Sequence, residues 1–294
     1  MKRFAPAKIN LSLEVLGKRP DGFHDLRSLF CPISLVDELD FERATCFEFS
    51  CSDPSIPRDE RNLVVKAAKW FGGGVLPKVR VHLEKRIPHS AGLGGGSSDA
   101  ATTLLALNEL ASEPKSFGEL SEIAASLGSD VPFFLHESPA WCEGRGERVA
   151  PARLENTFVV LLFKPGFGVP TPWAYKNLAA SRELPSIPYA RQQTVAGSLV
   201  NDLERPVFEK YVLLGLVKKW LLDQPETLGA LMSGSGATMF AIASKHADAT
   251  ALRERLLMEV GADNWTWVGS VMPFPLTDLR QGKSRSFSLE NRTK

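Results

Sequence analysis

The stretch Pro88-His89-Ser90-Ala91-Gly92-Leu93-Gly94-Gly95-Gly96-Ser97-Ser98-Asp99-Ala100-Ala101 decides the fold of this 294-residue chain. It follows residues 79–83, which alternate like a half-buried strand, and opens the Ala- and Leu-rich run 99–110, which has helical spacing. Glycines let a ligand approach the backbone closely, and the first turn of a helix offers unpaired N–H groups. The order strand, glycine-rich turn, helix therefore predicts an anion site, and a nucleotide phosphate is its natural ligand.

This loop differs from the two commonest phosphate-binding loops. A Walker A loop requires a lysine after its last glycine, but Ser97 follows Gly96. A dinucleotide fingerprint that starts at Gly92 requires a glycine where Ser97 stands. A flexible surface linker is the remaining alternative, and the close fit between two periodic elements disfavours it. The other glycine run, residues 72–74, follows a helix and is interpreted as its end.

Composition limits the classes of function. The chain is 44% hydrophobic and 23% charged, which is ordinary for a globular protein. A net charge of +1 gives no electrostatic reason to expect a nucleic-acid partner. We find no apolar stretch long enough to span a membrane, and a strand that starts within four residues of Met1 leaves no room for a signal peptide. The four cysteines lack the spacing of a metal site, so we expect reduced thiols. Together these features predict a cytoplasmic protein without a membrane partner.

The periodic segments predict an α+β protein. Strands are expected over most of residues 1–50 and at 157–163, the latter as a central strand, because it is continuously apolar. Asn62 predicts the start of a helix over 63–71, and the capping box Ser116–Glu119 predicts one that ends near Leu127. After residue 164 the spacing predicts helices over 206–223 and 247–260 and strands over 238–243 and 265–272. Residues 277–294 are basic and poor in apolar residues, which predicts a disordered tail.

Three motifs together resemble those of the GHMP kinases, named for galactokinase and the homoserine, mevalonate and phosphomevalonate kinases. They are residues 6–11 (PAKINL), the loop 88–101 and residues 233–240 (SGSGATMF). Residues 20–24 (PDGFH) and 128–133 (GSDVPF) are similar to those of one branch, the 4-diphosphocytidyl-2-C-methyl-D-erythritol kinases. The resemblance implies an N-terminal lobe like ribosomal protein S5 over 1–155 and a ferredoxin-like lobe over 156–276.

The same resemblance implies an ATP site in the N-terminal lobe. It would be formed by Pro88, Gly92, Leu93, Gly94, Gly95, Gly96, Ser97 and Ser98. The two serines are suited to phosphate or Mg²⁺, and Ser98 is equally suited to be the N-cap of the following helix. No set of metal ligands is evident, so Mg²⁺ is expected as a cofactor of ATP without assigned protein ligands.

Two charged residues are the predicted catalytic pair. Asp130 follows a helix-ending Gly128-Ser129 and, by the resemblance, would orient and deprotonate the acceptor hydroxyl. Lys8 would contact Asp130, keep it ionised and place positive charge near the transferred phosphoryl group. Asn10 lies two residues further on the same strand face and would hydrogen-bond the acceptor. Without the resemblance, Asp130 is an ordinary helix-end residue and Lys8 an ordinary strand lysine.

The acceptor implied by the resemblance is a cytidine-diphosphate-linked polyol of the non-mevalonate route to isoprenoids. Phe23, where the family commonly has Tyr, and His24 would stack on and bond the cytosine, and Tyr175 would stack as well, with Trp173 as its rival. The motif Ser233, Gly234, Ser235 and Gly236 would close the acceptor side. No chemistry is assigned to residues 201–204 (NDLE), a segment that the family shares.

Two alternatives and one departure stay open at this point. The chain could be another GHMP small-molecule kinase, of the homoserine or mevalonate type, or a non-catalytic nucleotide-binding protein of the same fold. The departure is His89-Ser90-Ala91, where family members often have glycine; a bulkier entry could shift the loop. The sequence carries no signal for the oligomeric state.

Overall fold

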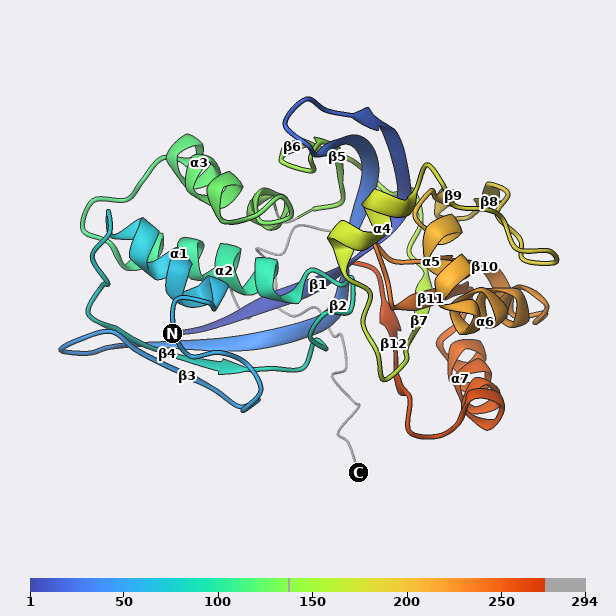
Figure 1. Cartoon of the computed structure of the whole chain (residues 1–294). Helices are drawn as coiled ribbons and strands as arrows, with labels where there is room; N and C mark the ends of the chain where they lie inside the picture. The colour runs from blue at the N-terminus through green and yellow to red at the C-terminus, as the bar shows by residue number, and fades with distance from the viewer. Residues whose placement is uncertain (137, 273–294) are drawn as a thin grey trace.

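The computed structural model describes residues 1–136 and 138–272, which fold as two lobes, each built on its own sheet (Figure 1). The predicted tail over 277–294 lies outside the described residues. The elements of the first lobe are β1 (Lys2–Lys18), β2 (His24–Arg43), β3 (Glu48–Cys51), α1 (Leu63–Phe71), β4 (Val79–Glu84), α2 (Gly95–Leu110), α3 (Phe117–Leu127), the 3-10 helix η1 (Pro132–Leu135), β5 (Ala140–Gly144) and β6 (Arg148–Pro151).

The second half of the chain continues with shorter elements. They are β7 (Val159–Lys164), α4 (Thr171–Asn177), β8 (Gln192–Thr194), β9 (Gly197–Asn201), α5 (Glu204–Lys210), α6 (Val212–Leu222), β10 (Thr227–Met232), β11 (Met239–Ala243), α7 (His246–Val260) and β12 (Trp265–Ser270). None of the helices among the described residues is both long and apolar enough to cross a bilayer.

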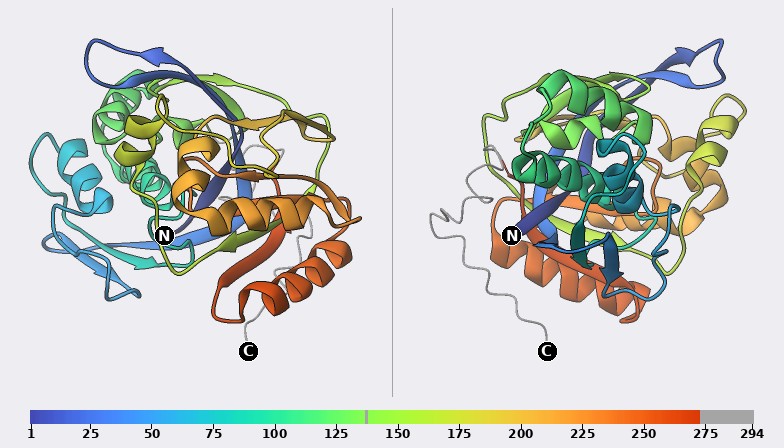
Figure 2. Two further views of the ribbon diagram at one scale, coloured as in Figure 1. Left: turned by 45° about the vertical axis from the view of Figure 1, so that its right-hand side comes forward. Right: turned by 90° about the vertical axis from the view of Figure 1, so that its left-hand side faces the viewer.

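An eight-stranded sheet forms the first lobe. Its strands run in the order β3-β4-β2-β1-β9-β8, and the β5–β6 hairpin branches from β2. Helices α1, α2 and α3 lie together over this sheet, as the two views of Figure 2 show. β4 alternates as predicted, with Val79, Val81 and Leu83 buried. The capping residues of α1 and α3 are also confirmed: Asn62 accepts from the Val64 N–H, and Ser116 forms a capping box with Glu119.

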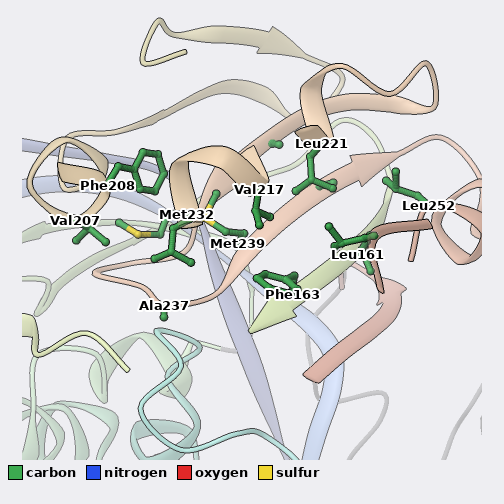
Figure 3. Close-up of a cluster of buried hydrophobic side chains, with 14 of the residues drawn as sticks. Leu161, Phe163, Val207, Phe208, Val217, Leu221, Met232, Ala237, Met239 and Leu252 are labelled. Carbon is green, nitrogen blue, oxygen red and sulfur yellow. The ribbon is translucent and has the colours of Figure 1, made fainter. Parts of the chain in front are cut away.

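The second lobe is built on an antiparallel sheet in the order β10-β11-β7-β12. Leu161 and Phe163 of β7 pack with α5, α6 and α7 on one face (Figure 3). Val160 and Leu162 pack on the other face with Ile9 and other residues of the first lobe. β7 is therefore covered on both sides, which explains its uninterrupted apolar run and confirms the predicted central strand.

One predicted helix differs from the structure, and several elements were not predicted. The helix expected over 206–223 is two helices, α5 and α6, because Tyr211 between them has a non-helical ψ of 67°. Residues 132–135, to which no element was assigned above, form the 3-10 helix η1, which begins at Pro132, whose ring fixes φ. β5, β6, β8, β9 and β10 were not predicted, because they are short or lack strict alternation. β9 lies after residue 155 in the chain but pairs in parallel with β1, so this strand pair joins the two predicted lobes. The lobe boundary at residue 155 itself stays a prediction.

Candidate functional site

The glycine-rich loop opens α2 and lines a cavity. Gly94 is the N-cap of α2, with a left-handed φ of 71° and no side-chain cap, so the helix starts three residues earlier than Ser98. Backbone atoms of residues 92–97 line the cavity of about 290 Å³, together with residues of α1 and of the 56–62 loop. The first N–H groups of α2 therefore lie at the wall of this cavity, the arrangement that attracts a phosphate.

The two predicted serines are not equivalent. Ser97 lines the cavity and is partly exposed. Ser98 is fully buried inside α2, and its hydroxyl finds no hydrogen-bond partner among the described residues. The interpretation of Ser98 as the N-cap is wrong, because Gly94 takes that position. Of the two hydroxyls, that of Ser97 is placed to reach a ligand.

Close packing explains why glycine stands at two loop positions. A Cβ on Gly92 would collide with the carbonyl oxygen of Ser233 and lie 2.9 Å from that of Gly236, and φ there is +74°. A Cβ on Gly94 would lie 2.8 Å from the ring of Phe134 and 3.1 Å from Cγ of Lys8. The loop therefore touches both the C-terminal glycine motif and the predicted catalytic lysine.

The unusual loop entry is accommodated by Ser90. Its φ is 53°, a left-handed value that a glycine adopts without strain and a serine adopts at a cost of about 1–2 kcal/mol. Ala91 is buried, and its carbonyl accepts a hydrogen bond from the Thr238 N–H at 3.3 Å. Within the entry 89–91, the left-handed strain therefore falls on Ser90.

A buried charge cluster beneath the loop was missed by the sequence reasoning. The Lys85 ammonium lines the cavity, is paired with the Asp37 carboxylate and lies 2.9 Å from that of Asp99. Asp37 also accepts hydrogen bonds from the N–H groups of Arg86 and Ile87, where the loop leaves β4. Burial raises the pKa of Asp99 to about 8, and Lys85 opposes the shift. One signal in the sequence could have marked Asp99 as buried. It lies seven residues before Ala106, so the two residues share the buried face of the helix.

β1 brings the predicted catalytic residues together. Lys8 is 3% exposed, and its ammonium donates to Oδ1 of Asn10 at 2.7 Å and lies 3.6 Å from Oδ2 of Asp130. The Lys8 backbone N–H donates to the Leu93 carbonyl at 2.9 Å, which ties the strand to the loop. Asn10 in turn donates to the hydroxyl of Ser28 at 2.8 Å. A pair of opposite charges, one of them two-thirds buried and one almost fully buried, thus borders the phosphate loop.

The predicted acceptor residues form two aromatic contacts. The ring of Tyr175 stacks on His24, with centroids 5.2 Å apart. Burial raises the pKa of the Tyr175 phenol, and the nearby Asp130 charge raises it further. Trp173 instead packs edge-on against Tyr211, beneath the Lys210 ammonium. Of the two rivals, the structure therefore places Tyr175, and not Trp173, beside His24.

Phe23 is 51% exposed and is covered by an arginine that the sequence reasoning did not single out. The Arg145 guanidinium lies 5.1 Å from the Phe23 ring centroid. Arg145 belongs to the β5–β6 turn, and a Cβ on its neighbour Gly146 would lie 3.8 Å from Oδ1 of Asp130. The β5–β6 turn therefore packs near the predicted base, and its Arg145 places a cation against the exposed aromatic ring.

The glycine turn, defined as Ser233–Gly236, reaches the same place from the second lobe. The hydroxyl of Ser233 donates to the Gly92 carbonyl at 3.0 Å. A Cβ on Gly234 would lie 3.4 Å from Oδ1 of Asn10 and 3.5 Å from Nζ of Lys8. The hydroxyls of Ser235 and Thr171 lie 2.7 Å apart and link the turn to α4, which carries Tyr175.

The comparisons with known proteins agree with this arrangement. Family models for the GHMP kinases N-terminal domain and the GHMP kinases C-terminal region match residues 62–138 and 195–262. The 4-diphosphocytidyl-2-C-methyl-D-erythritol kinase of Methylacidiphilum infernorum is 44% identical over 82% of this chain and 86% of its own length. That of Protochlamydia amoebophila is 43% identical over 82% and 84%.

Solved structures give the same result. A crystal structure of 4-(cytidine 5'-diphospho)-2C-methyl-D-erythritol kinase is 37% identical, covers 92% of this chain and 99% of its own, and has a TM-score of 0.75. The homoserine kinase of Cytophaga hutchinsonii covers 93% and 94% with a TM-score of 0.65 but only 17% identity, so it shares the fold alone. The chain therefore belongs to the GHMP kinases and, within them, to the 4-diphosphocytidyl-2-C-methyl-D-erythritol kinase family.

Proposed function

We propose that this protein transfers the γ-phosphoryl group of ATP to the 2-hydroxyl of 4-diphosphocytidyl-2-C-methyl-D-erythritol. The single observation that carries the proposal is the Lys8–Asp130 pair, 3.6 Å apart, beside the phosphate loop. Two relatives named 4-diphosphocytidyl-2-C-methyl-D-erythritol kinase are 43–44% identical over most of the chain, and they support the choice of acceptor.

ATP would occupy the cavity along the loop. Its phosphates would meet the first N–H groups of α2 and the Ser97 hydroxyl, so the developing charge is stabilised by donors already in place. The Lys8 ammonium adds positive charge at the reacting end. Phosphoryl transfer depends mainly on such positioning and charge neutralisation, and less on covalent chemistry by the protein.

Asp130 would accept the proton of the acceptor hydroxyl as its oxygen attacks the γ-phosphorus. The Lys8 ammonium lies beside it, 3.6 Å from Oδ2, and places positive charge next to the attacking oxygen. Asn10 is held by Lys8 and Ser28, and its amide would orient the polyol. A proton-accepting carboxylate that is already paired and partly exposed needs no large rearrangement to act.

The cytidine end would bind at Tyr175, His24 and Phe23. Arg145 is the cation against the Phe23 ring, in a turn that packs near Asp130, so it is suited to the diphosphate that joins the cytidine to the polyol. This assignment gives a role to the exposed Phe23 ring and to the arginine that covers it.

Mg²⁺ is proposed to arrive with ATP. Mg²⁺ commonly binds substrate phosphates together with one or two protein oxygens. The Ser97 hydroxyl at the cavity and the Asp130 carboxylate beside Lys8 would be the oxygen ligands available to it. When bound, the ion would neutralise charge on the phosphates.

A panel of acceptors tests the proposal. The purified protein is incubated with ATP, Mg²⁺ and one of three acceptors: the cytidine-diphosphate methylerythritol, homoserine or mevalonate. ADP release and the phosphorylated product are measured. We expect turnover with the first acceptor alone. Turnover only with homoserine or mevalonate would overturn the choice of substrate, and no turnover with any acceptor would favour the non-catalytic alternative.

A further inference from the structure

Residues 201–204, the NDLE segment without an assigned role, connect β9 to α5 at the junction of the two lobes. Asn201 is 5% exposed and carries the last pairing of β9 with β1, opposite Leu13. The Asp202 N–H donates to the Leu13 carbonyl at 3.0 Å, and the Asp202 carboxylate accepts from the Val15 N–H at 2.7 Å. The segment is thus fastened to β1, the strand that carries Lys8 and Asn10.

The side chain of Asn201 points from this strand pair to the glycine turn. Its amide nitrogen donates two hydrogen bonds, to the Met232 carbonyl at 2.7 Å and to the Gly234 carbonyl at 2.8 Å. Its amide oxygen accepts from the Leu203 N–H at 2.9 Å. Both donor hydrogens are used, so one buried side chain spans β10 and the glycine turn.

Glu204 holds the same end of β10 from a second side. Its carboxylate accepts from the Met232 N–H at 2.9 Å and pairs with the buried Lys218 at 2.5 Å. Met232 is the last residue of β10, so Glu204 holds the strand end while Asn201 also holds the turn beyond it. Of the hydrogen bonds that residues 201–204 make to the described part of the chain, the Asn201–Gly234 bond is the one that reaches the turn itself.

The position of Gly234 decides what the turn does to the site. A Cβ added to Gly234 would meet Oδ1 of Asn10 and Nζ of Lys8, at the distances given above, so the turn packs against both side chains, and the Ser233 hydroxyl donates to the Gly92 carbonyl. A shift of the turn would therefore change the space around the proposed acceptor hydroxyl and the entry of the phosphate loop together.

We propose that Asn201 is a positioning residue for phosphoryl transfer: through the Gly234 carbonyl it sets the glycine turn against Lys8 and Asn10. The inference rests on the proposed function for its kinetic consequence. It predicts that loss of the Asn201 amide lowers kcat more than it weakens ATP binding, because no residue of the glycine turn lines the cavity proposed for ATP.

Gln192 provides a matched control. Its side-chain amide also bridges β10, donating to the Ala230 carbonyl at 2.8 Å and accepting from the Ala230 N–H at 3.0 Å. Ala230 lies two residues before Met232, within the strand and away from the turn. Gln192→Leu therefore removes a similar bridge of amide hydrogen bonds without touching the turn.

The experiment compares wild type, Asn201→Ala, Asn201→Ser and Gln192→Leu. Each is measured for kcat and KM with the cytidine-diphosphate methylerythritol and ATP, for the Kd of a non-hydrolysable ATP analogue, and for thermal unfolding. Deuterium exchange of the peptide that contains residues 233–238 reports on the turn directly. The serine variant, which keeps a short polar side chain, replaces the alanine variant if the latter does not fold.

We expect kcat of the Asn201 variants to fall about 10- to 100-fold, the loss typical of a small misplacement of reacting groups. The analogue Kd should stay near that of wild type, exchange at 233–238 should rise, and Gln192→Leu should keep wild-type kcat despite a lower Tm. If Asn201 and Gln192 variants change kcat and exchange alike, Asn201 is merely structural and the inference is wrong. If wild type itself is inactive, the proposed function fails, and the exchange comparison still decides whether Asn201 sets the turn.

Discussion

The His24 imidazole and the Tyr175 phenol ring lie in stacked contact, 5.2 Å between centroids and 26° between planes. This separation is within the range of two rings that touch each other, so no base fits between them. A cytosine must therefore take the free face of Tyr175 or displace His24. In either case Tyr175 is the fixed wall, because its partly buried ring packs against the hydrophobic core of the second lobe, whereas its partner lies at the start of β2.

Tyr175→Leu is expected to raise KM for the cytidine-diphosphate acceptor about tenfold or more, because base–aromatic stacking contributes about 1–3 kcal/mol. KM for ATP should stay unchanged. Tyr175→Phe is the matched control, since it keeps the ring and loses only the hydroxyl. Steady-state kinetics with each substrate varied in turn measures both effects. Equal KM values for the leucine and phenylalanine variants would show that the ring does not bind the base.

Asp130→Asn is expected to lower kcat by about 10²–10⁴-fold, the contribution of a positioned general base. The asparagine is nearly isosteric, so binding of an ATP analogue should be retained and the fold should be intact. Single-turnover measurements separate the chemical step from binding and product release. A variant with wild-type kcat would exclude Asp130 as the base and leave Lys8 as the group to examine next.

Arg145→Met is expected to raise KM for the cytidine-diphosphate acceptor and to reduce its dependence on ionic strength, because a charge facing a diphosphate is lost. Arg148→Met, in the same hairpin but with an exposed side chain, is the control. KM is measured for both variants between low and high salt. The proposed diphosphate contact is wrong if the two arginine variants show the same KM and the same salt dependence.

Gly92→Ala is expected to abolish measurable ATP binding or to unfold the loop, since the added methyl would collide with the Ser233 carbonyl and φ is +74°. Gly96→Ala tests whether this collision is the cause, because a Cβ at Gly96 would meet only Cδ1 of Leu63, at 3.8 Å. Calorimetric titration with an ATP analogue compares the two variants. Similar loss of affinity in both would mean that loop flexibility, and not close packing, requires the glycines.

Asp99→Asn is expected to change how stability depends on pH. Asp99 has a pKa near 3.8 when unfolded and about 8 when folded, so the folded state binds the extra proton between these values. Its contribution to the free energy of unfolding therefore falls as pH rises from about 4 to about 8. The stability of Asp99→Asn relative to wild type should increase across this window, measured by urea unfolding.

Asp59→Asn is the comparison variant, and the change of its stability with pH should have the opposite sign. Hydrogen bonds from Arg61 lower the pKa of Asp59 to about 2, so the stability it contributes is lost as pH falls from about 4 toward 2. A difference between Asp99→Asn and wild type that does not change with pH would show that Asp99 stays ionised next to Lys85.

Local patterns in the sequence predicted much of the fold. The cap at Asn62, the capping box at Ser116 and the alternation in β4 involve neighbours within a few residues, and all are confirmed. The contact of Lys8 with Asp130 joins distant segments, and it was reached only through the resemblance to a family.

The missed features depend on long-range packing. Lys85, Asp37 and Asp99 come from a strand end, a second strand and a helix, so no local pattern marks them as one cluster. β9 has five residues and is a strand because β1 offers it a partner. The split at Tyr211 likewise follows from tertiary packing, since Phe167 stacks on its ring. The catalytic and binding roles of the site residues stay predictions until the variants are measured.

The parallel pairing of β9 with β1 has a consequence for synthesis of the protein. β1 receives its neighbour on one side only after residue 201 has been made. Until then one edge of β1, next to the future active site, remains without its full complement of backbone partners. The first sheet therefore cannot be completed before β9 has been made, and a nascent chain stalled before residue 197 should depend on chaperones to keep that edge from aggregating.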